Sequence, residues 1–350
     1  MAGKILTVSV AAYNVENTIE EVLDSLVVPD IMDKLEVFVV DDGGIDGTLK
    51  IAQKYQKKYP GTFYAVHKEN GGYGSTVNYS IAHATGKYFK LLDGDDWFNT
   101  QKLREFIDLL ERECADVIIT PYLECGDRSG KRKMNNLCTD MPEGHFAIND
   151  VKLNSYFDMY YLTYRTNLIK SIPLKLTENC FYTDAEYACL PVPYISNVYV
   201  WQHPVYLYRT EVAGQSMSIS GRLKHYLEHG QVFWRLADGY EEMILRRTLV
   251  EREQTERDGS EWARADIYRE RLSFMAGSHI HLLCLKEKSQ KSFEEIKEFC
   301  DTIKHNLPEI KKIAMRKSKF VCVLYMTHYR AYPILCRYYQ WQLRWRRKGD

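Results

Sequence analysis

The stretch Lys87-Tyr88-Phe89-Lys90-Leu91-Leu92-Asp93-Gly94-Asp95-Asp96-Trp97 decides the fold of this chain. Its first half is rich in apolar and β-forming residues, which predicts a buried strand. Three carboxylates follow within four residues, and burying them unpaired would cost several kcal/mol. We therefore expect a cation at the end of this strand. The alternative is an acidic loop that is merely solvated.

The first 120 residues alternate between strand and helix patterns. Apolar, β-branched runs predict strands at 4–12, 36–40 and 63–67, in the first half of the stretch 87–97 quoted above, and at 116–120. Helical periodicity predicts helices at about 16–28, 49–59, 75–84 and 100–113. Strands that alternate with helices of ten to fifteen residues favour an α/β fold, with a mostly parallel sheet and helices on both faces.

Polar residues and glycines gather where these strands end. The loops at the carboxyl ends carry a tyrosine, two aspartates and three glycines besides the acidic loop: Tyr13, Asp41, Asp42, Gly71, Gly72 and Gly74. Ligands of open α/β sheets bind at this edge, and Gly94 lets the backbone approach a ligand closely. A divalent cation that also contacts phosphate oxygens uses one or two carboxylates of this kind. Neither a Gly-x-Gly-x-x-Gly fingerprint nor a P-loop motif occurs, so a dinucleotide fold and a P-loop site are not supported.

Composition indicates a globular protein. The 350 residues suffice for two domains, and 45% hydrophobic content supports a real core. No run of 18 apolar residues and no secretory signal occurs, so we expect a cytoplasmic protein. The nine cysteines show no Cys-x-x-Cys pair and no zinc-like spacing, which predicts reduced, structural thiols.

The second half of the chain differs in character. A polar segment at 126–150 predicts a loop or hairpin, and 197–208 predicts a strand pair. After about residue 221 the sequence has few strand patterns. The segment 223–303 predicts several helices, with a charged linker at 251–261. We expect an α/β domain over 1–215 and a mainly helical region over 216–350.

Five motifs, in order, resemble those of the family 2 glycosyltransferases, whose nucleotide-sugar domain has the GT-A fold. They are Val8 to Asn14, Val39 to Thr48, Asn70-Gly71-Gly72 through Asn78, Ala84 to Asp96, and Tyr182-Thr183-Asp184. The resemblance covers roughly the first 215 residues. It implies a bacterial, non-processive enzyme, because the Gln-x-x-Arg-Trp motif of processive synthases is absent.

The resemblance also implies roles for individual residues. Tyr13 would pack on the uracil of a UDP-sugar and Asp41 would accept a hydrogen bond from the base. Asp95 would bind Mg²⁺ or Mn²⁺ bridging the diphosphate, and Asp184 matches the general base, with Glu186 as the alternative. The residues implied in donor binding are Ala11, Tyr13, Asp41, Asp93 and Gly94, with Asp93 near the ribose. Asp96 is interpreted as a brace for the loop, and Asp42 and Asp46 as turn and cap residues.

Some positions depart from the family pattern. Ala11 stands where a proline is usual, Val77 where a basic residue is frequent, and Thr183 where Glu often precedes the base. The predicted reaction is inverting sugar transfer from a UDP-sugar to a hydroxyl of a glycan acceptor, in cell-surface polysaccharide synthesis. A non-catalytic nucleotide- or glycan-binding protein of the same fold, or a nucleotidyltransferase, is the alternative.

Charge is unevenly distributed although the formal net charge is zero. From Ile310 to Gly349 the chain has eleven Lys or Arg and no Asp or Glu, so 36 basic and 46 acidic residues precede Ile310. Cations mixed with Tyr and Trp suit an anionic membrane surface. Because such transferases act on lipid-linked glycans, we expect peripheral contact with the inner face of the plasma membrane. Nucleic-acid binding is less favoured, and packing of this tail on the acidic remainder is the plain alternative.

Overall fold

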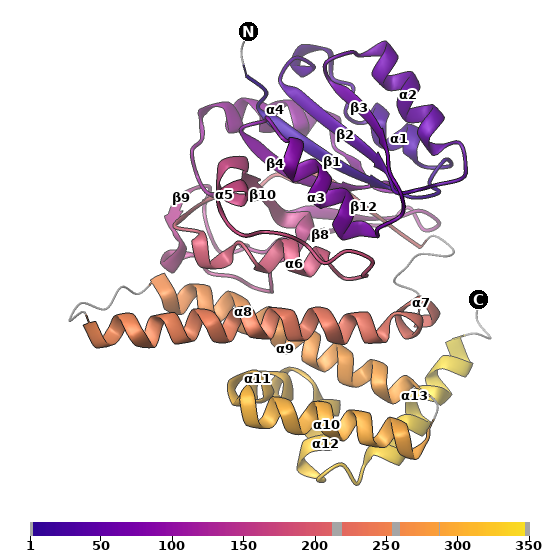
Figure 1. The fold of residues 1–350 in the computed structure, drawn as a ribbon, viewed down its shortest axis with the longest axis vertical. Helices are drawn as coiled ribbons and strands as arrows, with labels where there is room; N and C mark the ends of the chain where they lie inside the picture. Colours follow the sequence, from indigo (N-terminus) through magenta and orange to yellow (C-terminus); the bar gives the residue numbers. More distant parts are fainter. Residues whose placement is uncertain (1–2, 212–218, 254–259, 287, 347–350) are drawn as a thin grey trace. The chain divides into compact units, whose positions relative to one another are not determined.

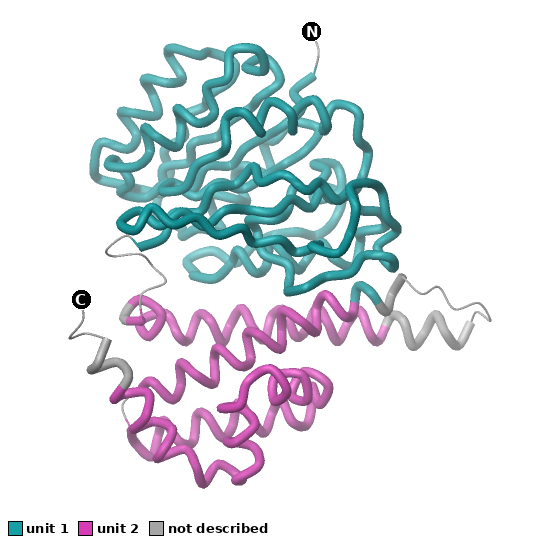
Figure 2. The backbone as a smooth tube through the Cα atoms, turned by 180° about the vertical axis from the view of Figure 1, so that it is seen from behind, with its two compact units in different colours: residues 1–213, 251–264 teal, residues 214–250, 265–350 magenta. Residues whose placement is uncertain are grey.

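A sheet of eight strands forms the centre of the N-terminal half of the chain in a computed structural model (Figure 1). The structure describes residues 3–211, 219–253, 260–286 and 288–346. Its residues divide into two compact units, 1–213 with 251–264, and 214–250 with 265–350 (Figure 2). That each unit is an independent domain stays a prediction.

The strands of the first unit build two sheets. The larger has the order β3-β2-β1-β4-β10-β6-β11-β9 and the smaller β5-β12-β7-β8. The strands are β1 Leu6–Ala12, β2 Leu35–Asp41, β3 Phe63–His67, β4 Tyr88–Asp93, β5 Trp97–Phe98, β6 Val117–Ile119, β7 Tyr122–Gly126, β8 Arg132–Asn135, β9 Gly144–Ala147, β10 Leu162–Arg165, β11 Asn197–Val200 and β12 Tyr206–Thr210.

Helices cover the larger sheet. α3 packs on β1 and β2, and α2 packs on β3 and α1. The α-helices of this unit are α1 Ile19–Asp24, α2 Thr48–Lys58, α3 Tyr73–His83, α4 Thr100–Arg112, α5 Thr166–Ser171 and α6 Asp184–Cys189, with short 3₁₀ helices at Pro29–Ile31, Ile148–Asp150, Met159–Tyr161 and Val192–Tyr194. The expected α/β fold is confirmed.

The strand register places the carboxyl ends side by side. β1, β2, β3 and β4 are parallel, whereas β10 runs antiparallel to β4. Asp93 of β4 lies opposite Ala11, Asp41 of β2 lies opposite Ala12, and His67 of β3 lies opposite Asp41. β1, β2 and β4 are almost wholly buried, and Val8, Val10 and Leu92 are 0% exposed. This core holds the strand ends, and with them the loops, in fixed positions.

Two expected elements differ from the structure. The helix expected at 16–28 is shorter and runs from Ile19 to Asp24, and Pro29 then favours extended backbone at Val28, which has φ −120° and ψ 105°. The two strands expected at 197–208 are present but do not pair with each other: β11 pairs with β6 and β9, and β12 pairs with β5 and β7. The segment between them contains Pro204, which cannot donate to a strand ladder, and it carries the chain from one sheet to the other. The polar segment after residue 126 does contain a hairpin, β7 with β8.

The second unit is helical. Its residues form α7 Ile219–Lys224, most of α8 Tyr226–Glu253 and of α9 Ser260–Leu285, α10 Gln290–Asn306, α11 Pro308–Lys317, α12 Lys319–Met326 and α13 Tyr332–Arg346. The expected charged linker falls largely on 254–259, outside the described residues. Among the residues the structure covers, no helix is both long and apolar enough to cross a membrane. All nine cysteines are free thiols, as expected.

The basic C-terminal segment is not a free tail. The Tyr325 hydroxyl donates to the Cys300 carbonyl at 2.9 Å, and the Tyr329 hydroxyl donates to Asp301 Oδ1 at 2.7 Å. Leu324 and Cys336 are 0% exposed. α12 and α13 therefore form part of the core of the second unit, because their apolar residues recur at helical spacing and cover α10. Residues 347–350 lie outside the described part of the chain.

Candidate active site

Three aspartates meet at the end of β4. One carboxylate oxygen from each of Asp93, Asp95 and Asp96 lies within 4.8 Å of the others. Asp93 Oδ1 is buried and has no hydrogen-bond partner. Burial, followed by the negative charge of Asp95, raises the pKa of Asp93 to about 8, and burial also raises the pKa of Asp95. The cluster has excess negative charge and a spare hard oxygen, so it fits a divalent cation such as Mg²⁺ or Mn²⁺.

Asp96 holds the acidic loop on the smaller sheet. Its side chain is buried, and its two oxygens accept from the Tyr206 hydroxyl at 2.6 Å and the Arg209 backbone N–H at 2.7 Å. The Tyr206 hydroxyl also accepts from the Asp93 N–H at 3.2 Å, and Arg209 Nε donates to the Asp95 carbonyl at 2.8 Å. Strand β12 thus contacts all three aspartates, and the interpretation of Asp96 as a brace is confirmed.

Arg209 has its own supports. Its guanidinium pairs with Glu21 and with Asp127, the latter at 2.8 Å, and lies over the Trp97 ring with Cζ 4.5 Å from the centroid. These contacts hold the side chain in one orientation, because a planar guanidinium that is paired and stacked loses its freedom to rotate. The positive charge also opposes the rise in the pKa of Asp95.

Gly94 brings the acidic loop against β1. A Cβ atom at this position would lie 2.8 Å from the Ala11 carbonyl oxygen, closer than real contacts allow. The Gly94 carbonyl accepts from the Thr18 hydroxyl at 2.8 Å. The absence of a side chain therefore lets the β4 loop lie beside the end of β1, where Ala11 and Tyr13 are.

Tyr13 and Asp41 lie at the same edge but in opposite environments. Tyr13 is 55% exposed, whereas Asp41 is 1% exposed. Asp41 Oδ2 lies 2.6 Å from His67 Nδ1, and Asp41 Oδ1 accepts from the Gly44 N–H at 3.2 Å. The aromatic ring is available to stack on a planar ligand, and the carboxylate next to it is oriented by two partners. His67 was missed by the sequence analysis, although its place at the end of the third strand could have pointed to it.

Asp42 supports the glycine loop. Its carboxylate accepts from the Gly71 and Gly72 N–H groups at 2.9 and 2.8 Å, and it pairs with Lys68 Nζ at 2.8 Å. Gly72 has a φ of 77°, which glycine adopts at little cost. Asp46 lies one residue before Gly47, the N-cap of α2, and accepts from the Thr48 N–H at 3.0 Å. Asp42 thus has the turn role that the sequence predicts, whereas Asp46 supports the start of α2 from outside the cap position.

The two candidate base residues on α6 have different surroundings. Glu186 is buried, and its oxygens accept from the Thr177 N–H and the Thr177 hydroxyl, both at 2.7 Å. Asp184 begins the helix, and its negative charge contributes to the raised pKa of Asp93 and of Tyr73. Burial is the largest cause of both raised pKa values, and the charge of Asp184 adds to it. Glu186 instead holds the preceding loop in place.

Some functional contacts had no local signal in the sequence. Tyr206 and Arg209 contact Asp96 across 110 and 113 residues. Burial, followed by the negative charges of Asp93 and Asp184, raises the pKa of Tyr73, at the start of α3. A tyrosine or arginine in a strand is common, so only the folded chain distinguishes these residues from their neighbours.

Comparison with known proteins agrees with this geometry. Residues 7–169 match the model of the family described as glycosyl transferase family 2. An uncharacterized glycosyltransferase of Mycoplasma pneumoniae, the MG060 homolog, is 28% identical over 225 residues, which is 63% of this chain and 74% of the relative. Poly(ribitol-phosphate) beta-N-acetylglucosaminyltransferase TarS of Staphylococcus aureus is 26% identical over 220 residues, 61% of this chain and 36% of TarS.

A solved structure shares the fold. Residues 1–349 of S. aureus TarS, in complex with UDP-GlcNAc, superpose with a TM-score of 0.65 at 17% identity, covering 99% of this chain and 92% of that one. The fold and these matches define a glycosyltransferase with the GT-A fold. Over residues 7–169, the chain matches the family 2 glycosyltransferases.

Proposed function

We propose that this protein moves a sugar from a UDP-sugar to a hydroxyl group of a glycan acceptor, with inversion at the anomeric carbon and with a bound Mg²⁺ or Mn²⁺. The observation that carries the proposal is the meeting of Tyr13, Asp41 and the aspartate cluster at one edge of the sheet. The TarS complex, with the same fold and a bound UDP-GlcNAc, supports a UDP-sugar as the donor class.

The donor would lie across the ends of β1, β2 and β4. The exposed Tyr13 ring would stack on uracil, and Asp41 would accept from a base N–H, since a carboxylate oxygen can accept more than one hydrogen bond. Ala11 and Gly94 would line the ribose with Asp93. Gly94 suits this place because its missing side chain leaves the backbone open to close approach.

Asp95 would hold the metal, with the unsatisfied Asp93 oxygen beside it. A divalent cation there would stabilise the negative charge that builds up on the departing diphosphate. Tyr206 and Arg209 hold the loop backbone before the ligand arrives, so little reorganisation is needed on binding. Such preorganisation is what makes electrostatic stabilisation effective.

Asp184 would act as the general base. The acceptor oxygen attacks the anomeric carbon, the bond from that carbon to the UDP oxygen breaks, and the hydroxyl proton passes to the Asp184 carboxylate. Attack from the face opposite UDP inverts the centre. Glu186 is less suited to this role, because both of its oxygens already accept hydrogen bonds from Thr177 in the interior.

The acceptor is proposed to be a lipid-linked glycan of the cell surface, glycosylated at the inner face of the plasma membrane. TarS, which is named a poly(ribitol-phosphate) beta-N-acetylglucosaminyltransferase, supports a polymeric acceptor.

The first test of the donor site is a calorimetric titration of UDP with and without Mn²⁺, with ADP and GDP as controls. We expect metal-dependent binding that is selective for UDP. Asp95→Asn should abolish it, whereas Asp30→Asn, which removes a carboxylate paired with Arg104 on the surface, should not. Equal binding of all three nucleotides, or metal-dependent binding that survives in Asp95→Asn, would contradict the proposed site.

The base is tested by a matched pair of variants. Asp184→Asn should bind UDP normally and turn over about 10² to 10⁴ more slowly. Glu186→Gln keeps an oxygen for the Thr177 N–H and should retain turnover per folded molecule. The reverse pattern would move the base to Glu186. Released UDP supports sugar transfer, whereas released pyrophosphate would indicate a nucleotidyltransferase.

A further inference from the structure

Helix α12 turns an apolar stripe toward solvent. Val321, Leu324 and Tyr325 face the interior and are buried. On the opposite side, at positions i, i+4 and i+7, lie Lys319, Val323 and Met326, with Val323 42% and Met326 71% exposed. A surface helix ordinarily has polar residues on this face. An outward stripe of apolar residues next to a lysine indicates an interaction surface.

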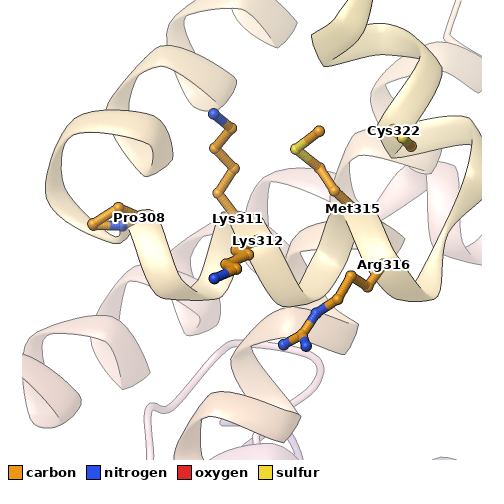
Figure 3. A pocket seen from close by; sticks show the side chains of 6 residues that line it. All are labelled: Pro308, Lys311, Lys312, Met315, Arg316 and Cys322. Carbon is orange, nitrogen blue, oxygen red and sulfur yellow. The ribbon is translucent and has the colours of Figure 1, made fainter.

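The stripe adjoins a cavity of about 550 Å³ (Figure 3). Cys322 of α12 forms part of its wall, and Cys322 Sγ lies 3.5 Å from Met326 Sδ, which joins cavity and stripe. The remaining lining comes from α11, and the full set is Pro308, Lys311, Lys312, Met315, Arg316 and Cys322. Three cations thus surround a space whose other walls are apolar.

These cations have no acidic partner among the described residues. Lys311 lies 5.0 Å from the centroid of the Tyr325 ring, and Lys312 and Arg316 are exposed. Glu309, the single acid of α11, pairs with Arg269 at 2.8 Å. From Ile310 to Gly349 the sequence contains no carboxylate side chain.

We infer that α11 and α12 form a docking surface for an anionic membrane, with lipid phosphate groups among Lys311, Lys312 and Arg316 and with Val323 and Met326 in the interfacial layer. We name it the α11–α12 lipid face. Charge complementarity selects anionic lipid over a neutral surface, and the apolar stripe favours a bilayer over a soluble phosphate. The inference places membrane contact on packed helices instead of on the last residues of the chain.

Helix α13 carries a second stripe of the same kind. Ile334, Tyr338 and Trp341 recur at i, i+4 and i+7 and are 70%, 50% and 59% exposed. Tyr and Trp prefer the boundary between headgroups and acyl chains, because each has an apolar body and a polar group. This stripe adds interfacial residues within the same helical unit, beside the cationic Arg337.

The test is flotation of the full-length protein with vesicles of phosphatidylcholine alone and of phosphatidylcholine mixed with phosphatidylglycerol. We expect binding to the anionic vesicles only, weakening as salt increases. The triple variant Lys311→Gln, Lys312→Gln, Arg316→Gln should lower the partition coefficient roughly a hundredfold, at about fivefold per charge. The matched control removes three exposed lysines from α2, Lys50→Gln, Lys54→Gln and Lys57→Gln, and should change binding little.

The apolar stripe has its own variant pair. Val323→Thr with Met326→Gln should weaken vesicle binding at every salt concentration, whereas Met134→Gln, also exposed but in the first unit, should not. All substituted side chains are at the surface, so circular dichroism should be unchanged. UDP binding serves as a separate readout, since the lipid face does not depend on the proposed donor site.

Three results would overturn the inference. The first is absence of binding to anionic vesicles, and the second is equal loss in the α2 control. The third is binding of inorganic phosphate or a soluble polyanion at Lys311, Lys312 and Arg316 without vesicle binding, which would assign the cavity to a soluble ligand.

Discussion

Replacing Tyr206 with Phe tests whether strand β12 prepares the acidic loop for a metal. The Tyr206 hydroxyl donates to Asp96 at 2.6 Å and accepts from the Asp93 N–H at 3.2 Å. Tyr206→Phe keeps the ring, which packs on Phe98, and removes only the hydroxyl. A hydrogen bond to a charged group contributes about 1.5–3 kcal/mol, and the Asp93 N–H bond is long and contributes less. Because Asp96 retains the Arg209 N–H, we expect a loss of about 2 kcal/mol in the free energy of unfolding.

The same substitution should weaken the metal site without touching a ligand. Removing a group that orients metal-binding residues typically costs about 10- to 100-fold in affinity. We expect the apparent affinity for Mn²⁺ in the presence of UDP to fall by that factor, measured by calorimetry beside urea unfolding. Tyr64→Phe is the control, because its hydroxyl makes one exposed bond of 3.3 Å to the Gly61 carbonyl. Unfolding that is destabilised while metal affinity is unchanged would refute the argument that β12 positions the acidic loop.

Two further predictions concern packing and pH. Gly74→Ala should destabilise the first unit by about 1–3 kcal/mol in urea unfolding, because its Cβ would lie 2.1 Å from the Thr177 carbonyl oxygen, whereas Gly3→Ala, with nothing within 4 Å, should be neutral. Burial, followed by the positive charge of Lys286, lowers the pKa of His279 to about 4. In the unfolded chain its pKa is near 6.5, so the folded state disfavours protonation of this histidine. The free energy of unfolding therefore decreases as pH falls from about 6.5 toward 4. Between pH 7.5 and 5 this loss is about 2 kcal/mol, and His279→Gln should remove it from the pH dependence of thermal unfolding; an unchanged pH profile would assign the effect elsewhere.

Much of the first unit could be predicted because its signals are local. The expected strand at 63–67 agrees with β3, and the expected helix at 49–59 differs from α2 by one residue at each end. Buried parallel strands read as continuous apolar runs, and Asp and Gly mark the turns that follow them. The convergence of Asp41 and Asp93 at one edge then follows from the parallel order of the strands.

Other features had no such signal. The separation of β11 from β12 depends on which strands accept them as partners, and that is set by sheet assembly. The charge pattern of the basic segment from Ile310 to Gly349 suggested a region separate from the rest of the chain. In the structure, α12 and α13 pack in the helical unit through buried residues such as Leu324 and Cys336. Charged residues mark the exposed face of a helix, and they do not indicate which elements the opposite, apolar face packs against.

The sequence by itself determined the class of this protein. The order of strands and helices predicts the α/β fold, and the five motifs resemble those of the family 2 glycosyltransferases. Only the tertiary structure showed which donors surround each carboxylate. Asp42, Asp96 and Glu186 hold backbone and hydroxyl groups, whereas Asp93 retains an unsatisfied oxygen in the cluster. The physical reason is that a carboxylate's role depends on the donors around it, and for Asp96 those donors come from residues more than a hundred positions away.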